Sequence, residues 1–242
     1  MPLLLPRRQG ATPPPSGAPR APDWFDGEAG QALLRSEAEA VRRVLAGCPA
    51  LPWAWLGIPA AVAPAGSRGL LLRPDGQQWR GAVRCGLPLP IASESLGAVL
   101  LQHVLDGDDD PGGLLEECAR VLAPGGTLWL AALNPWAPYR MRWAGTGLQA
   151  RTPGGWQSRL RRAGLPAGAV QLQWLGPTWH ARPGAAGIGA LDLLRAGLAM
   201  TVTKRMQAGV LSGGRRVLRW RPAAVPVAGH ASGQAGGAAA RR

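Results

Sequence analysis

Residues 87–133 read LPLPIASESLGAVLLQHVLDGDDDPGGLLEECARVLAPGGTLWLAAL and follow the pattern of a strand, a helix and a second strand. The apolar run 97–102 is typical of a central strand that is buried on both faces. Asp110-Pro111 predicts the start of a helix that ends near Leu122, because aspartate caps helices and proline suits their first turn. Residues 127–133 predict the next strand. Such a βαβ unit places a ligand at the carboxyl end of its first strand.

Strands and helices alternate on both sides of this unit. A helix is expected over about 26–46, with Asp26 as its cap and with Glu37 outside its apolar stripe. Further helices are expected over 153–163, with Thr152 before the first turn, and over 187–199. The other expected strands are 53–57, 69–72, 82–85, 170–174 and 200–206. This order predicts an α/β fold in which three layers form a sandwich around a mostly parallel sheet.

The length of 242 residues suffices for one well-buried α/β domain with tails. Residues 1–22 are rich in proline and arginine and show no periodicity, so we expect a disordered N-terminal tail. Residues 222–242 are rich in alanine and glycine and predict a second disordered tail. The folded domain is therefore expected at 23–221. Because the sequence shows neither a membrane-spanning apolar run nor a secretory signal, we expect a cytoplasmic protein.

The net charge of +13 is distributed unevenly. Residues 1–118 hold 10 arginines and 13 acidic residues, which gives −3, whereas residues 119–242 hold 17 basic residues and one acidic residue, which gives +16. A half with this charge favours polyanions, and RNA is a partner of that kind. A second explanation is compositional, since Lys204 is the only lysine and the abundant residues Ala, Gly, Pro, Arg and Trp have GC-rich codons.

The cysteines and the acidic turn bear on metal binding. Three cysteines, Cys48, Cys85 and Cys118, are odd in number and widely spaced, which argues against a disulfide framework and against a zinc site. The acidic residues between 106 and 110 admit two interpretations, a metal site or a solvated turn that caps the following helix. We favour the turn and expect no metal. The acidic residues are Asp106, Asp108, Asp109 and Asp110.

Residues 89–128 contain the run LPxxxxSxxxVxxxHVLxxxxDPxxxLxExxRVLxPGGxL, in which x is any residue. This run resembles the second half of class I S-adenosylmethionine-dependent methyltransferases, in particular the type 11 methyltransferase domain family. The resemblance extends over about 51–174 and includes Asn134-Pro135-Trp136, while Lys204-Arg205 matches a later basic segment of a bacterial subgroup. It implies a Rossmann-like class I methyltransferase fold, S-adenosylmethionine as cofactor, and methyl transfer to an unidentified acceptor.

The resemblance also implies where the cofactor binds. Gly57 matches the first glycine of the family's glycine-rich turn, whose backbone approaches the cofactor because no Cβ intervenes. Pro59 and Ala61 replace the second and third glycines, so this motif is degenerate. Arg73 stands where an acidic residue takes the ribose hydroxyls, and Asp75 is the carboxylate that we expect in this role. Gly57, Ala61 and Asp75 are therefore candidate cofactor-binding residues.

Five later candidates follow from the same resemblance. Arg84, Cys85 and Leu87 match positions that line the adenine pocket, and Gln102 and His103 match positions that cover the cofactor at the end of a strand. His103 is also the candidate catalytic residue, as the base for an acceptor that must lose a proton. The alternative is structural, a hydrogen bond from His103 to the following turn at 106. No larger catalytic set is expected, because a sulfonium donor brings its own leaving group and needs mainly alignment.

The basic half leaves two alternatives open for its aromatic and charged residues. Its tryptophans either stack on a planar acceptor or fill the core, and its arginines either bind phosphate or form a solvated face. These residues are Trp136, Trp143, Trp156, Arg140, Arg142, Arg159, Arg161 and Arg162. Two functions rival methyl transfer: a non-catalytic methyltransferase-like binding protein, suggested by Pro59 and Arg73, and an RNA-associated protein. The sequence does not indicate the oligomeric state.

Overall fold

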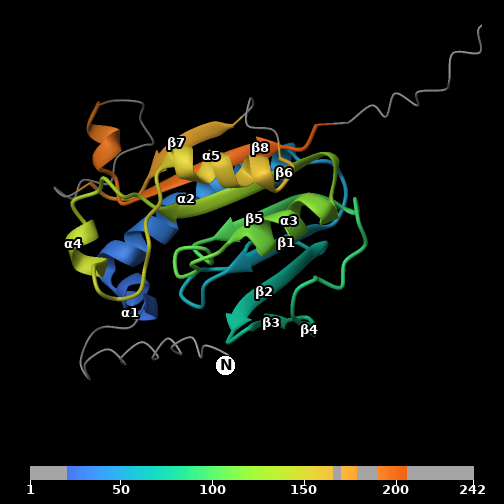
Figure 1. Cartoon of the computed structure of the whole chain (residues 1–242), viewed down its shortest axis with the longest axis horizontal. Coiled ribbons are helices and arrows are strands. Elements are labelled where there is room, and N and C mark those ends of the chain that lie inside the picture. Colours follow the sequence, from blue (N-terminus) through green and yellow to red (C-terminus); the bar gives the residue numbers. More distant parts are fainter. Residues whose placement is uncertain (1–20, 166–169, 179–189, 206–242) are drawn as a thin grey trace, which may run out of the picture. The chain divides into compact units, whose positions relative to one another are not determined.

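The computed structural model describes residues 21–165, 170–178 and 190–205, all within one compact unit, Met1–Gln207. Its strands are β1 (Trp53–Gly57), β2 (Gly69–Asp75), β3 (Gln78–Gly81), β4 (Arg84–Cys85), β5 (Leu96–Gln102), β6 (Leu122–Leu133), β7 (Gln171–Leu175) and β8 (Gly197–Thr203). They form one eight-stranded sheet in the order β4-β3-β2-β1-β5-β6-β8-β7 (Figure 1). Residues 1–20 and 222–242 of the expected tails lie outside the described ranges.

Helices cover both faces of this sheet. They are α1 (Ala21–Asp26), α2 (Glu28–Gly47), α3 (Gly112–Val121), α4 (Arg140–Trp143) and α5 (Pro153–Arg162), with a 3₁₀ turn, η2, at Ala190–Leu194. Helices α3 and α5 pack into one apolar cluster, and α1, α2 and α4 pack into a second cluster on the opposite face (Figure 1). The expected three-layer α/β sandwich is thereby confirmed. None of the helices in the described ranges has the length and apolarity needed to cross a membrane.

Most strands of the sheet run in one direction, as expected. Neighbours β2, β1, β5 and β6 pair in parallel, whereas β3 and β8 run against their neighbours. Strands β4 and β7 pair antiparallel with β3 and β8 and so return to the common direction. Residues 124–126, which were expected to separate a helix from a strand, lie inside β6, where the register against β5 shifts.

Alternate side chains of the central strands pack on opposite faces of the sheet. On β5, Val99 joins the cluster with α3 and α5, whereas Leu100 joins the cluster with α2. Leu100 lies in register between Trp55 on β1 and Trp129 on β6, and all three side chains are buried. Burial of each such side chain contributes about 1.5–3 kcal/mol. The apolar runs that predicted these strands therefore also hold them at the centre of the sheet. Their position in turn determines the edge of the sheet at which a ligand would bind.

Two helix starts differ from the expectation. Asp26 ends α1, which begins inside the segment expected to be a tail, and Gly27 precedes α2 without a side-chain cap. The cap position of α3 is Pro111 rather than Asp110, although Asp110 Oδ1 accepts the amide of Gly112 at 3.3 Å. In both cases the aspartate predicted a helix start within two residues of the observed one, but it is not the cap residue of the helix.

The segment 187–203 departs most from the expectation. Instead of a helix to residue 199, its described part holds η2 and then β8, which begins at Gly197 and ends at Thr203. Strand β8 pairs antiparallel with β6 along its whole length and is buried at its first four positions. A buried apolar run of this length has no periodicity that distinguishes a strand from a helix. Its pairing with β6 therefore determines that the segment is a strand.

The connection from β1 to β2 shapes the ligand edge of the sheet. Residues 58–68 contain no helix, although parallel strands are usually joined through one. After β2 the chain turns back immediately: Asp75 pairs with Gln78 across a two-residue loop in which Gly76 has a φ of +63°. Strands β2, β3 and β4 are therefore an antiparallel meander, of which the sequence predicted β2 and β4 but not β3.

Candidate functional site

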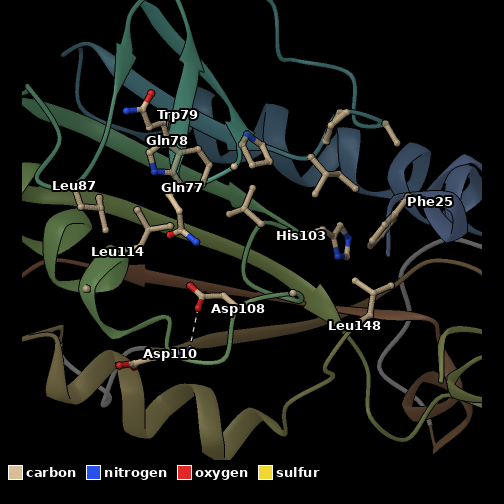
Figure 2. A pocket seen from close by; sticks show the side chains of 18 of the residues that line it. Phe25, Gln77, Gln78, Trp79, Leu87, His103, Asp108, Asp110, Leu114 and Leu148 are labelled. Carbon is tan, nitrogen blue, oxygen red and sulfur yellow. Dashed lines mark hydrogen bonds between the residues drawn. The ribbon is translucent and has the colours of Figure 1, made fainter. Parts of the chain in front are cut away.

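A pocket of about 580 Å³ lies at the carboxyl ends of β1, β2 and β5. Ligands bind at this position in open parallel sheets, and the volume falls in the range of small-molecule sites. Figure 2 shows Trp79, Leu87 and Leu114 at one end of the pocket and Phe25 and Leu148 at the other. Both ends of the pocket therefore have apolar walls.

Elements that are distant in sequence bring these walls together. The tight turn after β2 places Gln77 and Trp79 at the pocket, α3 supplies Leu114, and α1 supplies Phe25. Sequence reasoning missed Gln77, Trp79 and Phe25. For the first two a signal existed, because Asp75-Gly76 is a dipeptide typical of two-residue hairpin turns. For Phe25 we find no comparable signal.

Carboxylates supply the negative charge of the pocket. Asp26, Asp108 and Asp110 all belong to its lining. Asp108 Oδ1 accepts the amide of Asp110 at 3.0 Å, which orders the turn that follows β5 (Figure 2). The resulting field favours a ligand that carries a positive charge or donates hydrogen bonds.

The candidates from the sequence lie around this pocket, but only some of them line it. Leu87 and His103 belong to the lining. The candidates outside the lining are Gly57, Ala61, Asp75, Arg84, Cys85 and Gln102. Their chain neighbours Ile58, Ala60 and Gly76 do line the pocket. The sequence thus indicated this edge of the sheet, and the individual cofactor contacts stay predictions.

Gly57 has a structural reason to be glycine. A Cβ at this position would lie 2.0 Å from Cζ2 of Trp55, so any side chain would displace the indole. The indole is fixed there because its Nε1 donates to Gln102 Oε1 at 3.0 Å. Gly57 therefore makes room for a buried ring, a role that the family resemblance did not imply.

The expected ribose carboxylate is engaged at the edge of the sheet. Asp75 Oδ2 lies 3.5 Å from Nη2 of Arg84, and both side chains are largely exposed. Arg84 Nε also donates to Gln78 Oε1 at 2.8 Å. Burial raises the pKa of the neighbouring Cys85 thiol. Asp75, Arg84 and Cys85 thus form part of the β2–β4 meander beside the pocket.

A buried polar network lies beneath the pocket. Gln102 Nε2 donates to Glu37 Oε2 at 2.7 Å, and Glu37 Oε1 lies 2.7 Å from Nε2 of His103. His103 Nδ1 lies 2.7 Å from Asp106 Oδ2, and the Asp106 carboxylate also accepts the amide of Leu133 at 3.1 Å. The side chains of Glu37, His103 and Asp106 are fully buried. Glu37, which was expected outside the apolar stripe of its helix, therefore points into the protein.

The network holds His103 in its charged form. Both ring nitrogens face carboxylate oxygens, and only an imidazolium donates from both. Burial by itself lowers the pKa of His103, yet the charges and hydrogen bonds of Glu37 and Asp106 raise it to about 10. The ring of Phe25 also covers the imidazole, with ring centroids 4.7 Å apart. A covered imidazolium is a poor base, so the geometry favours the structural alternative for His103.

The acidic turn spreads its carboxylates in different directions. Asp106 faces His103, whereas Asp109 Oδ1 accepts from the side chain of Gln149. Within the ranges that the structure describes, no three His, Cys, Asp or Glu side chains converge on a common metal position. The turn orders the chain between β5 and α3.

The tryptophans and arginines of the basic half lie in different surroundings. Trp143 and Trp156 are buried core aromatics, whereas Trp136 is 49% exposed and tilts against Trp174. The last turn of α5 carries Arg159 and Arg162, where cations interact favourably with the helix dipole. Of the three candidate stacking tryptophans, Trp136 alone presents its ring to the surface.

Residues 75–130 match the model of a family described as a methyltransferase domain. The match starts at the end of β2 and ends within β6, so it includes most residues of the pocket lining. The sheet with its pocket places the chain among class I methyltransferase folds. The match covers residues 75–130, and over this segment the chain is similar to the methyltransferase-domain family that its sequence resembles.

Similar solved structures come from several organisms. A S-adenosylmethionine-dependent methyltransferase of Thermotoga maritima, described as a possible histamine N-methyltransferase, is 17% identical, with 75% of this chain and 93% of that chain covered and a TM-score of 0.49. A methyltransferase of Archaeoglobus fulgidus is 11% identical, with coverages of 75% and 96% and a TM-score of 0.48. One of Mesorhizobium loti is 16% identical, with coverages of 74% and 100% and a TM-score of 0.45. No curated protein matches the sequence.

Proposed function

We propose that the chain binds S-adenosylmethionine in the pocket and transfers its methyl group to an acceptor. The observation that carries this proposal is the position of the pocket at the carboxyl ends of β1, β2 and β5, with most of its lining residues in the segment 75–130 that matches a methyltransferase domain. Open parallel sheets bind nucleotide cofactors at this edge.

The residues of the pocket suit this cofactor. Trp79 and Leu87 offer a flat apolar wall for the adenine ring. Gln77 and Gln78 bring amide groups to the end of β2, where the ribose hydroxyls need acceptors and the family uses a carboxylate. Asp26 supplies negative charge at the other end, which suits the sulfonium of the donor. When bound, the cofactor supplies the methyl group and its own leaving group.

The contribution of the chain would be alignment, exclusion of water and, where needed, a base. Correct alignment alone contributes roughly 7–11 kcal/mol in the best intramolecular systems. Phe25 and Leu148 give the acceptor end of the pocket an apolar surface. His103 keeps its own proton, so for an acceptor that must lose a proton the candidate bases are the lining carboxylates Asp26, Asp108 and Asp110.

Calorimetric titration with S-adenosylhomocysteine, the product of the cofactor, tests the proposal. We expect micromolar binding by the wild-type protein and an affinity weakened roughly 5- to 150-fold in Trp79→Ala, because stacking of a base on an aromatic ring contributes about 1–3 kcal/mol. Trp136→Ala is the matched control, since this ring lies outside the pocket lining. An equal loss in both variants would speak against the assigned wall.

A second candidate function is a non-catalytic binding protein with a methyltransferase fold. It is favoured by the connection after β1, which lacks a helix and in which Pro59 offers no amide donor to a ligand. The same titration separates the two functions. A cooperatively folded protein that binds no S-adenosylhomocysteine up to millimolar concentration would support the second candidate and end the first.

A further inference from the structure

Arg73 lies on β2 where the family resemblance led us to expect an acidic residue. Its Nη1 donates to the carbonyl oxygens of Ile58 at 3.0 Å and Pro59 at 2.5 Å, and its Nη2 donates to that of Ala61 at 3.1 Å. The guanidinium also lies over the ring of Trp55, 5.2 Å from its centroid. One side chain of β2 therefore holds three carbonyl groups of the connection that leaves β1.

This connection packs against the core on one side and faces two cavities: Ala61 belongs to the cluster with α2, and Ile58 and Ala60 pack against that cluster. On one side Ile58 and Pro59 line the pocket, and on the other side lies a second cavity of about 520 Å³ beside α2. Ala60 lines both cavities, and Val62 is 86% exposed, whereas Ala61 is buried. Because cavities lie on two sides of the segment, the hydrogen bonds from Arg73 add to this packing in holding its conformation.

We propose that Arg73 is a positioning residue that fixes residues 58–61 as the wall of the cofactor pocket, in place of the crossover helix that is missing between β1 and β2. The proposal rests on the proposed function, because the wall matters only to a ligand of this pocket. Its stabilising effect comes from charged donors, whose hydrogen bonds are about twice as strong as neutral ones.

The clamp also accounts for the loss of the acidic residue at this position. A carboxylate accepts hydrogen bonds and would repel the carbonyl oxygens that Arg73 binds, so the two arrangements exclude each other. In this chain the end of β2 supports the wall, and recognition of the ribose falls to the following turn at 76–78.

Two measurements on the full chain test this inference. The first is hydrogen exchange of the amides of Ile58 and Ala61, which donate to the carbonyls of Gln102 and Ile58 and so report on the wall. The second is the affinity for S-adenosylhomocysteine. We expect Arg73→Met to exchange faster at these amides and to bind at least tenfold more weakly, because it keeps an unbranched apolar stem but has no donor.

The control is Arg80→Met, because Arg80 is the exposed partner of Arg73 on β3. This variant should change neither the amide exchange nor the affinity for S-adenosylhomocysteine. Arg73→Lys keeps a charged donor and should fall between wild type and Arg73→Met in both measurements. Methylguanidinium added to Arg73→Ala should restore part of the affinity, which a purely destabilising substitution would not show.

The outcomes separate the two proposals. Unchanged exchange at Ile58 and Ala61 in Arg73→Met would overturn the clamp, and so would faster exchange with an unchanged affinity. If the wild-type protein does not bind S-adenosylhomocysteine at all, the proposed function fails, and the exchange data alone then decide whether Arg73 holds the connection.

Discussion

At the scale of single residues, His103 illustrates how surroundings outweigh residue type. It ends a strand at the ligand edge, yet its backbone adopts a left-handed conformation with a φ of +57°, and its ring lies between Glu37 and Asp106 under Phe25. A buried imidazolium offsets the desolvation cost of its two carboxylate neighbours, and they offset its own. His103 consequently joins α2 to the turn after β5.

Because His103 is buried and charged, we expect the free energy of unfolding to fall as the pH becomes alkaline. The pKa of this histidine is about 10 in the folded protein, against 6.5 for an ordinary histidine, so between these values only the folded state holds the proton. The contribution is fully present below pH 6.5 and is lost as the pH rises through 10, at up to about 1.4 kcal/mol per pH unit.

Urea unfolding of the wild-type protein and of His103→Gln, measured from neutral pH to pH 10, checks this expectation. The free energy of unfolding should fall with pH in the wild type, and the variant should be less stable at neutral pH with a flatter profile. Parallel profiles would show that another group titrates in this range.

At the scale of elements, helix α5 offers a direct test of a predicted start. Thr152 Oγ1 accepts the amide of Gly155 at 3.2 Å, and Pro153 occupies the first turn. Thr152→Ala should lower the free energy of unfolding by about 1 kcal/mol, measured by urea unfolding. Thr152→Ser keeps the hydroxyl and should stay close to wild type. An equal loss in the serine variant would assign the effect to the methyl group instead of the cap.

The elements that the sequence predicted well have either uniform burial or clear signals at their ends. Strand β5 is buried at every position, and α5 carries both a capping threonine and Gly164 beyond its end, at a φ of +85°. Strand β3 was missed because it is exposed at most positions and carries no apolar alternation. Strand β8 was expected to start at residue 200, and its first three residues were assigned to a helix, because the apolar run has no periodicity and its pairing with β6 determines where the strand begins.

The site was predictable in its location but not in its side chains. The order of strands and helices fixes which strand ends meet, and that indicated the edge with Leu87 and His103. It does not fix contacts between distant segments, such as those that bring Phe25 and Leu148 to the pocket. Nor does it reveal that Gly57 leaves room for the ring of Trp55, because that depends on the rotamer of the tryptophan.

At the scale of the whole molecule, Lys204 joins the end of β8 to the middle of the chain. Its Nζ donates to the carbonyl oxygens of Ala119 at 2.9 Å and Leu122 at 2.8 Å, at the carboxyl end of α3, and lies 3.1 Å from Oε1 of Glu94. The only lysine of the chain therefore satisfies carbonyl groups that the helix leaves unpaired.

Lys204→Met should lower the free energy of unfolding by about 1–3 kcal/mol, because hydrogen bonds from a charged donor are lost while the side chain keeps its length. Urea unfolding measures this loss, and Arg205→Met, at the exposed next position, should remain within error of wild type. A Lys204→Met protein as stable as wild type would show that water replaces the lysine at these carbonyls. RNA binding by the basic half stays a prediction, because six of its basic residues lie at 206–242, outside the described ranges.

The meander that ends the sheet beside the pocket has a consequence for self-association. Its outermost strand, β4, is only two residues long, and Arg80 and Arg84 place positive charges along this margin. Long, uncharged outer strands recruit other chains through their unpaired backbone groups, whereas a short and charged one gives an incoming strand too little to hold. The margin nearest the pocket is thereby protected from fibril-like stacking of copies.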